Sequence, residues 1–389
     1  MTKTSALRTA RRLDEVGFSE IVRIMNQVMA LRAAGQTVHA FHGGEPFFNT
    51  PERVKRAAAQ AIDENHTQYP PASGLLPLRG ALVEKLARKN KITATTDEVI
   101  ATAGSTQGLF AAFQSVLDPG DDVLVFAPYW TPIGDVIRCA GSRPLLLPTV
   151  TARRNGLSKT LQQFSTPQTR AIYLNSPQNP SGIVFTQAEI EEIAEFAHKR
   201  DLVVIADEAY EDLVYEGGHH SIASLPGMAE RTISCFTFSK TYSMTGWRAG
   251  YAVAKEPFIT GLRRMVLYST IGVATPVQYA MLEALKSPES ELAARREEFR
   301  KRRDLLVAAL NDAGLDCETP AGAFYAFPNA EKISRNSQAA AEMLFEKARI
   351  ATVPGSVFGA QGEGHLRFSF SVQIDEIEEC AKALKKFFS

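Results

Sequence analysis

The sequence has no excess of charge of either sign, because 43 Lys and Arg residues balance 43 Asp and Glu residues. A protein that binds nucleic acid or an anionic membrane usually carries a basic surface, so this balance argues against both functions. No run approaches the roughly 18 consecutive apolar residues that a membrane-spanning helix needs. The first residues, MTKTSALRTARRLDEVGF, are basic without an apolar stretch, so they predict an exposed N-terminal arm rather than a secretory signal.

Cysteine is scarce and metal-binding motifs are missing. Cys139, Cys235, Cys317 and Cys380 stand far apart, and none of them forms a C-x-x-C pair. Cysteines spaced in this way are typical of proteins in a reducing compartment. The spacing does not fit a disulfide framework or a zinc site. The seven histidines include no H-E-x-x-H motif. We therefore expect a cytoplasmic protein with no structural metal.

The middle of the chain alternates short apolar runs with helix-like segments. Runs of this length, bounded by Gly, Pro, Asn or Asp, are typical of strands that are buried on both faces. The alternation predicts an α/β protein with a mostly parallel sheet. The apolar runs are VIATAG (99–104), VLVFAP (123–128), AIYLN (171–175), LVVIAD (202–207), TISCFTF (232–238) and AGYAV (249–253).

The 389 residues are enough for two domains, and the pattern changes near residue 285. One long charged helix is predicted over 288–313, with Ser287 as its N-cap. A smaller α+β unit follows it, and a helix at about 19–34 is expected to pack onto that unit. The predicted bounds are 46–285 for the large domain, and 1–45 together with 286–389 for the small domain.

Polar residues follow the predicted strands, at the edge where parallel sheets bind ligands. The run VIATA is followed by Gly104, Ser105 and Thr106 at the start of a helix. Free backbone N–H groups and hydroxyls at a helix N-terminus can bind a phosphate, although Ser and Thr are also ordinary helix caps. The turn NSPQNPSG (175–182) can hold the side chain of Asn179 in a fixed direction, which alone is a weak signal.

An acidic pair, Asp207 and Glu208, ends the run LVVIA. A carboxylate at the end of a buried strand is costly unless it has a partner, which favours a functional role. The pair also resembles the Walker B strand of an ATPase. That interpretation fails, because the phosphate-binding motif requires a Gly-Lys dipeptide and the sequence contains none.

A lysine, Lys240, follows the run TISCFTF. Burial and nearby cations lower the pKa of such a lysine, as an amine that forms a Schiff base requires. Thr237, Ser239 and Arg248 could complete the phosphate site. A hydride-transferring enzyme would need G-x-G-x-x-G after a strand, and that motif is missing.

Taken together, these motifs resemble the fold-type I, class I/II aminotransferases (aspartate/aromatic aminotransferase-like), which use pyridoxal 5′-phosphate (PLP). The resemblance covers essentially the whole chain and follows the family's order and spacing. It implies a large domain with a mostly parallel seven-stranded sheet flanked by helices, plus a small α+β domain from both chain ends. The matching motifs are GEP (44–46), YPPASG (69–74), PYW (128–130), NSPQNPSG (175–182), DEAY (207–210), SKTYSMTGWR (239–248) and HLRFS (365–369).

The resemblance implies a role for each catalytic residue. Lys240 would hold PLP as an internal aldimine and act as the general base. Asp207 would pair with the pyridinium nitrogen and keep the ring an electron sink. Asn179 and Tyr210 would hydrogen-bond the 3′-oxygen of the ring, and Trp130 would stack on the ring unless it is only a core residue.

The same resemblance implies residues for the phosphate and the substrate. Arg367 would form a bidentate pair with the substrate α-carboxylate, near Asn179 and the backbone of Gly44. Tyr69 would reach the phosphate of the partner subunit in a homodimer. The residues expected around the phosphate within one chain are Gly104, Ser105, Thr106, Thr237, Ser239 and Arg248.

The implied function is transfer of an amino group between an α-amino acid and a 2-oxo acid. A PLP-dependent lyase, acting by β-elimination at a carbon–sulfur bond, by γ-elimination or by cyclisation, stays open as an alternative, because the same residues serve both. A regulatory module without enzymatic activity is a less favoured alternative, because the sequence contains all the catalytic residues that the resemblance implies. The pair Phe47-Phe48 beside GEP suggests an aromatic or bulky substrate. We expect neither nucleic acid nor membrane as a partner.

Overall fold

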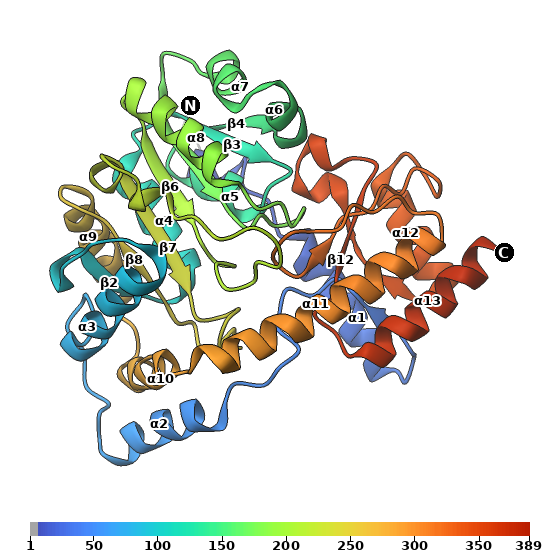
Figure 1. Ribbon diagram of the computed structural model, residues 1–389, viewed down its shortest axis with the longest axis horizontal. Coiled ribbons are helices and arrows are strands. Elements are labelled where there is room, and N and C mark those ends of the chain that lie inside the picture. The colour runs from blue at the N-terminus through green and yellow to red at the C-terminus, as the bar shows by residue number, and fades with distance from the viewer. Residues whose placement is uncertain (1–6) are drawn as a thin grey trace, which may run out of the picture.

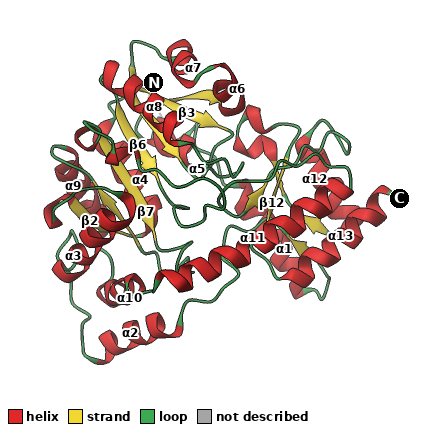
Figure 2. Cartoon of the chain, in the orientation of Figure 1, coloured by secondary structure: helices red, strands yellow, loops and turns green. Residues whose placement is uncertain are grey.

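The computed structural model describes residues 7–389 and consists of two lobes (Figure 1). The larger lobe contains a seven-stranded sheet, and the smaller lobe contains a three-stranded sheet with helices from the C-terminal part of the chain. The long helix α11 (Glu289–Asp312) runs from the larger lobe into the smaller one. Helices and strands alternate along most of the larger lobe (Figure 2).

The large sheet has the strand order β2-β8-β7-β6-β5-β3-β4, and β8 runs in the direction opposite to the other six strands. The predicted mostly parallel, seven-stranded sheet is therefore confirmed. Its strands are β2 (Val99–Thr102), β3 (Asp122–Ala127), β4 (Arg143–Pro148), β5 (Thr169–Asn175), β6 (Val203–Asp207), β7 (Thr232–Thr237) and β8 (Gly250–Val253).

Helices cover both faces of this sheet, and the side chains of β3 show why the apolar runs are continuous. Val123 and Val125 join one core cluster, which includes residues of α4, α5 and α9. Leu124 and Phe126 join the other cluster, with residues of α6, α7 and α8. The helices of this lobe are α2 (Glu52–Asp63), α3 (Leu76–Lys85), α4 (Gly104–Val116), α5 (Pro132–Cys139), α6 (Thr149–Asn155), α7 (Leu157–Phe164), α8 (Gln187–Lys199), α9 (Phe258–Thr270) and α10 (Thr275–Leu285).

The smaller lobe joins the two ends of the chain. Strand β1 near the N-terminus pairs in parallel with β10, and Ser369 donates its backbone N–H to Phe41 O at 2.7 Å. Helix α1 packs Ile24 and Val28 against Val353, as the sequence predicts. The exact domain bounds stay a prediction. Besides α11, the elements of the smaller lobe are α1 (Glu20–Ala33), β1 (His39–Ala40), β9 (Tyr325–Ala326), α12 (Ser337–Ala348), β10 (Ile350–Ala351), β11 (Val353–Pro354), β12 (Leu366–Ser369) and α13 (Ile374–Phe388).

The expected N-cap of the long helix is wrong by one residue. Helix α11 begins at Glu289, with Pro288 rather than Ser287 at the N-cap position and no side-chain cap. The hydroxyl of Ser287 instead accepts a hydrogen bond from Arg53 on α2.

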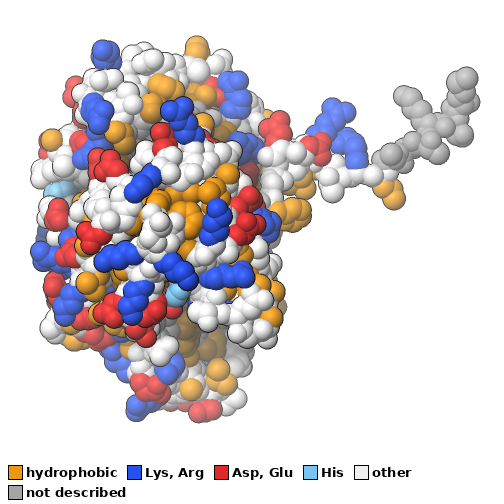
Figure 3. Space-filling view, turned by 90° about the vertical axis from the view of Figure 1, so that its right-hand side faces the viewer, with side chains coloured by type: hydrophobic (Ala, Val, Ile, Leu, Met, Phe, Trp, Pro, Cys, Tyr) orange, Lys and Arg blue, Asp and Glu red, His pale blue; other side chains and the backbone are white. Residues whose placement is uncertain are grey.

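The surface shows no region dominated by one charge on the face seen in Figure 3, where Lys and Arg alternate with Asp and Glu. Residues 7–15 are exposed, as expected of an N-terminal arm, whereas residues 1–6 of the predicted arm lie outside the described residues. Within residues 7–389, no helix is both long and apolar enough to cross a membrane.

Candidate active site

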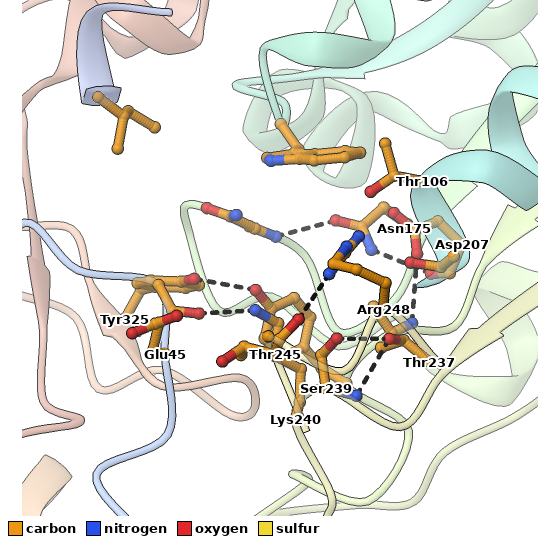
Figure 4. Close-up of a pocket in the computed structure, with 18 of the residues that line it drawn as sticks. Glu45, Thr106, Asn175, Asp207, Thr237, Ser239, Lys240, Thr245, Arg248 and Tyr325 are labelled. Carbon is orange, nitrogen blue, oxygen red and sulfur yellow. Dashed lines mark hydrogen bonds between the residues drawn. The ribbon is translucent and has the colours of Figure 1, made fainter. Parts of the chain in front are cut away.

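A cavity of about 350 Å³ lies at the edge of the large sheet where its parallel strands end. Residues from both lobes line it, and Figure 4 shows several of them pointing into a common space. Of the fourteen site residues predicted from the sequence, all but Gly104 and Tyr69 lie in this lining. The complete lining is Ile21, Gly44, Glu45, Ser105, Thr106, Trp130, Asn175, Asn179, Asp207, Ala209, Tyr210, Thr237, Ser239, Lys240, Thr245, Gly246, Arg248, Tyr325 and Arg367.

Lys240 follows strand β7 and enters the cavity from below the sheet edge in Figure 4. Its Nζ donates a hydrogen bond to Gly44 O at 2.6 Å. Burial lowers the pKa of Lys240 to about 8, although the Glu45 carboxylate opposes the shift. A lowered pKa increases the fraction of free amine near neutral pH, so this lysine is suited to nucleophilic attack on a carbonyl group.

Asp207 ends strand β6, directly beside the strand that precedes Lys240. Its side chain is buried, accepts a hydrogen bond from Tyr173 Oη at 2.8 Å, and accepts a longer one from Ala209 N at 3.3 Å. Burial raises the pKa of Asp207 to about 6, and the hydrogen bond from Tyr173 acts in the opposite direction. A buried carboxylate of this kind can hold a positively charged ring nitrogen.

Hydroxyls and a guanidinium gather around the N-terminus of α4. Ser105 and Thr106 lie in its first turn, while Thr237 and Ser239 come from the end of β7 and share a hydrogen bond of 2.9 Å. Arg248 lies beside them and donates to Thr245 O at 2.8 Å. Donors and a helix N-terminus in this arrangement suit a phosphate group.

Gly104 does not line the cavity, but the structure explains the residue type. Its φ angle is +76°, and a Cβ at this position would lie 2.6 Å from Nη2 of Arg248. Any side chain at position 104 would therefore displace the guanidinium of Arg248.

Arg367 on β12 is 2% exposed and lies over the ring of Tyr325 at 4.4 Å. Its Nη1 donates to Asn179 Oδ1 at 3.0 Å and its Nη2 to His42 O at 2.8 Å, whereas Nε has no hydrogen-bond partner among residues 7–389. Within the part of the chain that the structure describes, no acidic side chain forms an ion pair with Arg367. Burial lowers the pKa of this guanidinium. A buried cation without a counter-ion can bind an incoming carboxylate.

Several lining residues were not predicted, and Tyr325 is the most informative. Its hydroxyl lies 2.9 Å from that of Tyr210, and its ring lies under Arg367. The motif GAFYAFP marks it as part of a strand, but nothing in the sequence indicates its partners. Ile21 on α1 also lines the cavity without having been predicted. The spacing of apolar residues along α1 predicts only that this helix packs against the rest of the protein.

Tyr69 does not reach the cavity of its own chain. It is 84% exposed on a loop near the start of α10, where it lines a surface pocket together with Gly272 and Thr275. The contact of Tyr69 with the phosphate of a partner stays a prediction.

The hypothesis that Phe47 and Phe48 line the substrate site is wrong. Both rings pack edge-on against Phe299 of α11 at 5.3 and 5.7 Å, and Arg302 and Arg295 cover them. Their bulk therefore fills the contact with the long helix and carries no information about the substrate.

The residues present fit PLP in three independent ways. A phosphate would find hydroxyls and Arg248 at a helix N-terminus, a pyridinium nitrogen would find Asp207, and an aldehyde would find the amine of Lys240. The site and the doubly covered sheet together define a PLP-dependent transferase of fold type I.

Comparison with known proteins places the chain within that class. A family model described as aminotransferase class I and II matches residues 38–384. The chain is 36% identical to aromatic-amino-acid aminotransferase 2 of Thermococcus litoralis, over 96% of this chain and 97% of that protein. It is 38% identical to a probable aspartate/prephenate aminotransferase of Thermus aquaticus, over 97% and 98%.

Solved structures agree with the sequence relatives. The aspartate aminotransferase from Thermus thermophilus with maleate superimposes with a TM-score of 0.92 at 35% identity, over 98% of this chain and all of that one. The chain belongs to the class I and II aminotransferases. It is an enzyme that transfers amino groups, and its cofactor is PLP.

Proposed function

We propose that the cavity between the lobes holds PLP and the amino-acid substrate, with Lys240 as the residue that binds the cofactor. The observation that carries the proposal is the meeting of three groups in one cavity. Lys240 and Asp207 follow neighbouring strands of the large sheet, and Arg367 reaches the same space from the smaller lobe. A lysine, an acid and a buried cation are what the cofactor and an α-amino acid together require.

The proposed contacts to the cofactor are supported by the residues that line the cavity. Asp207 pairs with the pyridinium nitrogen, and Asn179 and Tyr210 hydrogen-bond the ring oxygen. Trp130 stacks on the ring. The phosphate would lie against Ser105, Thr106, Thr237, Ser239 and Arg248, and Gly104 would leave room for the guanidinium of Arg248.

Separate residues of the chain bind the substrate and transfer its proton. Arg367 binds the α-carboxylate through two parallel hydrogen bonds, and the backbone at Gly44 closes on the same group. The Nζ of Lys240 takes the proton from the substrate Cα, and in the reverse half-reaction it delivers a proton to Cα of the new amino acid. PLP supplies the electron sink that makes this proton acidic.

We further propose a cytoplasmic homodimer in which Tyr69 of each chain contacts the phosphate in the other. The exposed phenol on a proline-rich loop supports this arrangement, because a C₂ interface would use it twice. The division into a large domain of 46–285 and a small domain of 1–45 plus 286–389 belongs to the same proposal. The two lobes and the contacts of α1 support it.

Borohydride reduction and peptide mapping test the central assignment. The adduct should lie on Lys240 alone, Lys240→Arg should carry none, and Lys255→Arg should serve as the control. Lys255 is a good match, because it lies outside the cavity in an ion pair with Glu98. An adduct on any other lysine would contradict the proposal.

The names of the relatives support transamination over elimination. Purified enzyme, incubated with pooled amino acids and pooled 2-oxo acids, should form new amino acids in equal amount to the oxo acids released. Release of ammonia without an oxo-acid acceptor would instead point to the lyase alternative.

A further inference from the structure

Tyr173 carries a polar group into an apolar core. It lies on β5, is 1% exposed, and belongs to the cluster between the sheet and α4, where its ring centroid is 6.1 Å from that of Phe113. A buried hydroxyl costs free energy unless it forms a hydrogen bond, and phenylalanine would fill the same space without that cost. The hydroxyl therefore requires an explanation beyond packing.

The hydroxyl has a single partner among residues 7–389. Tyr173 Oη donates to Asp207 Oδ2 at 2.8 Å, which is the shorter of the two hydrogen bonds to this carboxylate. The other oxygen, Oδ1, accepts only the long bond from Ala209 N. One oxygen of Asp207 is thus fixed by the protein, and the other is left with capacity to accept a strong hydrogen bond.

Among the groups around Asp207, Tyr173 contributes substantially to keeping the carboxylate ionised. Burial favours the neutral acid, and the adjacent Glu208 acts in the same direction, while Lys240 favours the carboxylate. Cys235 and Tyr210 also lie near Asp207, but burial raises the pKa of both well above neutrality, so neither is charged. Tyr173 is therefore the main neutral group that favours the ionised form.

We propose that Tyr173 is a positioning residue that acts through Asp207. Its hydroxyl orients the carboxylate and keeps it ionised, so that Asp207 can hold the proton of the cofactor ring nitrogen. This inference rests on the proposed role of Asp207. It assigns a function to a residue that does not line the cavity and does not touch the cofactor or the substrate.

The test compares Tyr173→Phe with Tyr251→Phe. Tyr251 is a matched control, because it lies in the same sheet on β8 and its buried hydroxyl has no hydrogen-bond partner in the described part of the chain. Both variants should keep the circular dichroism spectrum and a cooperative melt. Tyr173→His, which retains a ring N–H donor, gives a second variant if Tyr173→Phe does not fold.

Loss of a hydrogen bond to a charged group should lower kcat of Tyr173→Phe about 10-fold or more, with little change in KM for the amino acid. Without this bond the pKa of Asp207 rises, so the protonated acid persists to higher pH. The acid limb of the kcat profile should therefore move to higher pH. The affinity of the apo-protein for PLP, measured by equilibrium dialysis, should fall as the pH is lowered, and should do so at a higher pH than in the wild type.

Asp207→Asn separates failure of this inference from failure of the proposed function. When Asp207→Asn is already present, adding Tyr173→Phe should lower kcat little further, because the carboxylate on which Tyr173 acts is gone. If Tyr173→Phe matched Tyr251→Phe in kcat, pH profile and PLP affinity while Asp207→Asn was impaired, the role of Tyr173 would be refuted. If Asp207→Asn itself left all three unchanged, the proposed role of Asp207 would be wrong.

Discussion

The hydroxyl oxygens of Tyr210 and Tyr325 lie 2.9 Å apart, although the two residues are separated by 115 positions in the chain. Tyr210 follows β6 of the large sheet, and Tyr325 lies on β9 of the small sheet. Their rings meet at 79° with centroids 5.8 Å apart. This contact links the proposed cofactor site to Arg367, because the ring of Tyr325 also lies under that guanidinium.

Tyr325→Phe should keep the ring under Arg367 and remove only the hydrogen bond to Tyr210. A neutral hydrogen bond is worth about 0.5–1.5 kcal/mol, so kcat/KM should fall roughly 2- to 10-fold. Steady-state kinetics check this. Tyr215→Phe is the control, because its hydroxyl donates to Ala323 O outside the cavity, so it should change stability and leave kinetics unchanged.

Arg367→Lys should raise KM for α-amino acids by a factor of a hundred or more, because a lysine cannot form two parallel hydrogen bonds to a carboxylate. Loss of a buried hydrogen-bonded charge pair costs about 2–5 kcal/mol. The visible spectrum of bound PLP should change little. Arg302→Lys is the control, since Arg302 is equally buried but pairs with Glu298 on α11. An unchanged KM would mean that Arg367 is only structural.

Lys240→Met should stabilise the apo-protein at pH 7. The pKa of Lys240 is about 8 in the folded chain against its usual 10.5, so the buried charge opposes folding below pH 8. Between pH 8 and 10.5 the unfolded chain binds a proton that the folded chain has lost, and stability rises with pH. The variant should therefore gain up to about 3 kcal/mol at pH 7 and nothing above pH 10.5.

Urea unfolding of the two apo-proteins at pH 7, 9 and 10.5 measures this difference. Lys255→Met provides the control for loss of a lysine. A variant that is less stable than the wild type at pH 7 would show that Lys240 is stabilised as a cation in the folded chain.

Tyr69 variants test the shared site. Tyr69→Phe should weaken PLP retention and lower the melting temperature of the dimer, with recovery in excess PLP. Mixing Lys240→Ala with a Tyr69 variant of very low activity should give hybrid dimers that contain one intact site, and so about half the activity of a wild-type dimer in that fraction. Verified hybrids without activity, or an active monomer in sedimentation, would exclude the arrangement.

Local chemistry explains which parts of the fold could be predicted. The central strands are buried on both faces, so their apolar runs are unmistakable. Strand β4 was not recognised, because RPLLLP contains prolines at both ends. Those prolines are tolerated because β4 is one of the two edge strands of the sheet and pairs only with β3.

Residues of the cavity could be predicted where an unusual side chain stands at the end of a predicted strand. Lys240 and Asp207 stand out because charged side chains rarely end buried strands. Tyr325 and Tyr173 do not, since an aromatic residue in an apolar strand has the same sequence signature whether its hydroxyl is functional or not. Phe47 was misassigned for a related reason: its position beside Gly44 says nothing about which way the ring points.

The joining of the two chain ends in the smaller lobe also sets an order of assembly during synthesis. The residues around the proposed phosphate site lie between 104 and 248, whereas Arg367 is made more than 100 residues after the last of them. At the usual rate of about 5–20 residues per second, the ribosome needs roughly 10 s to cover the intervening part of the chain. Residues 39–41 are made early, but their partners on β10 and β12 follow more than 300 residues later. A nascent chain therefore contains the groups that hold the cofactor before it contains the group that holds the amino acid.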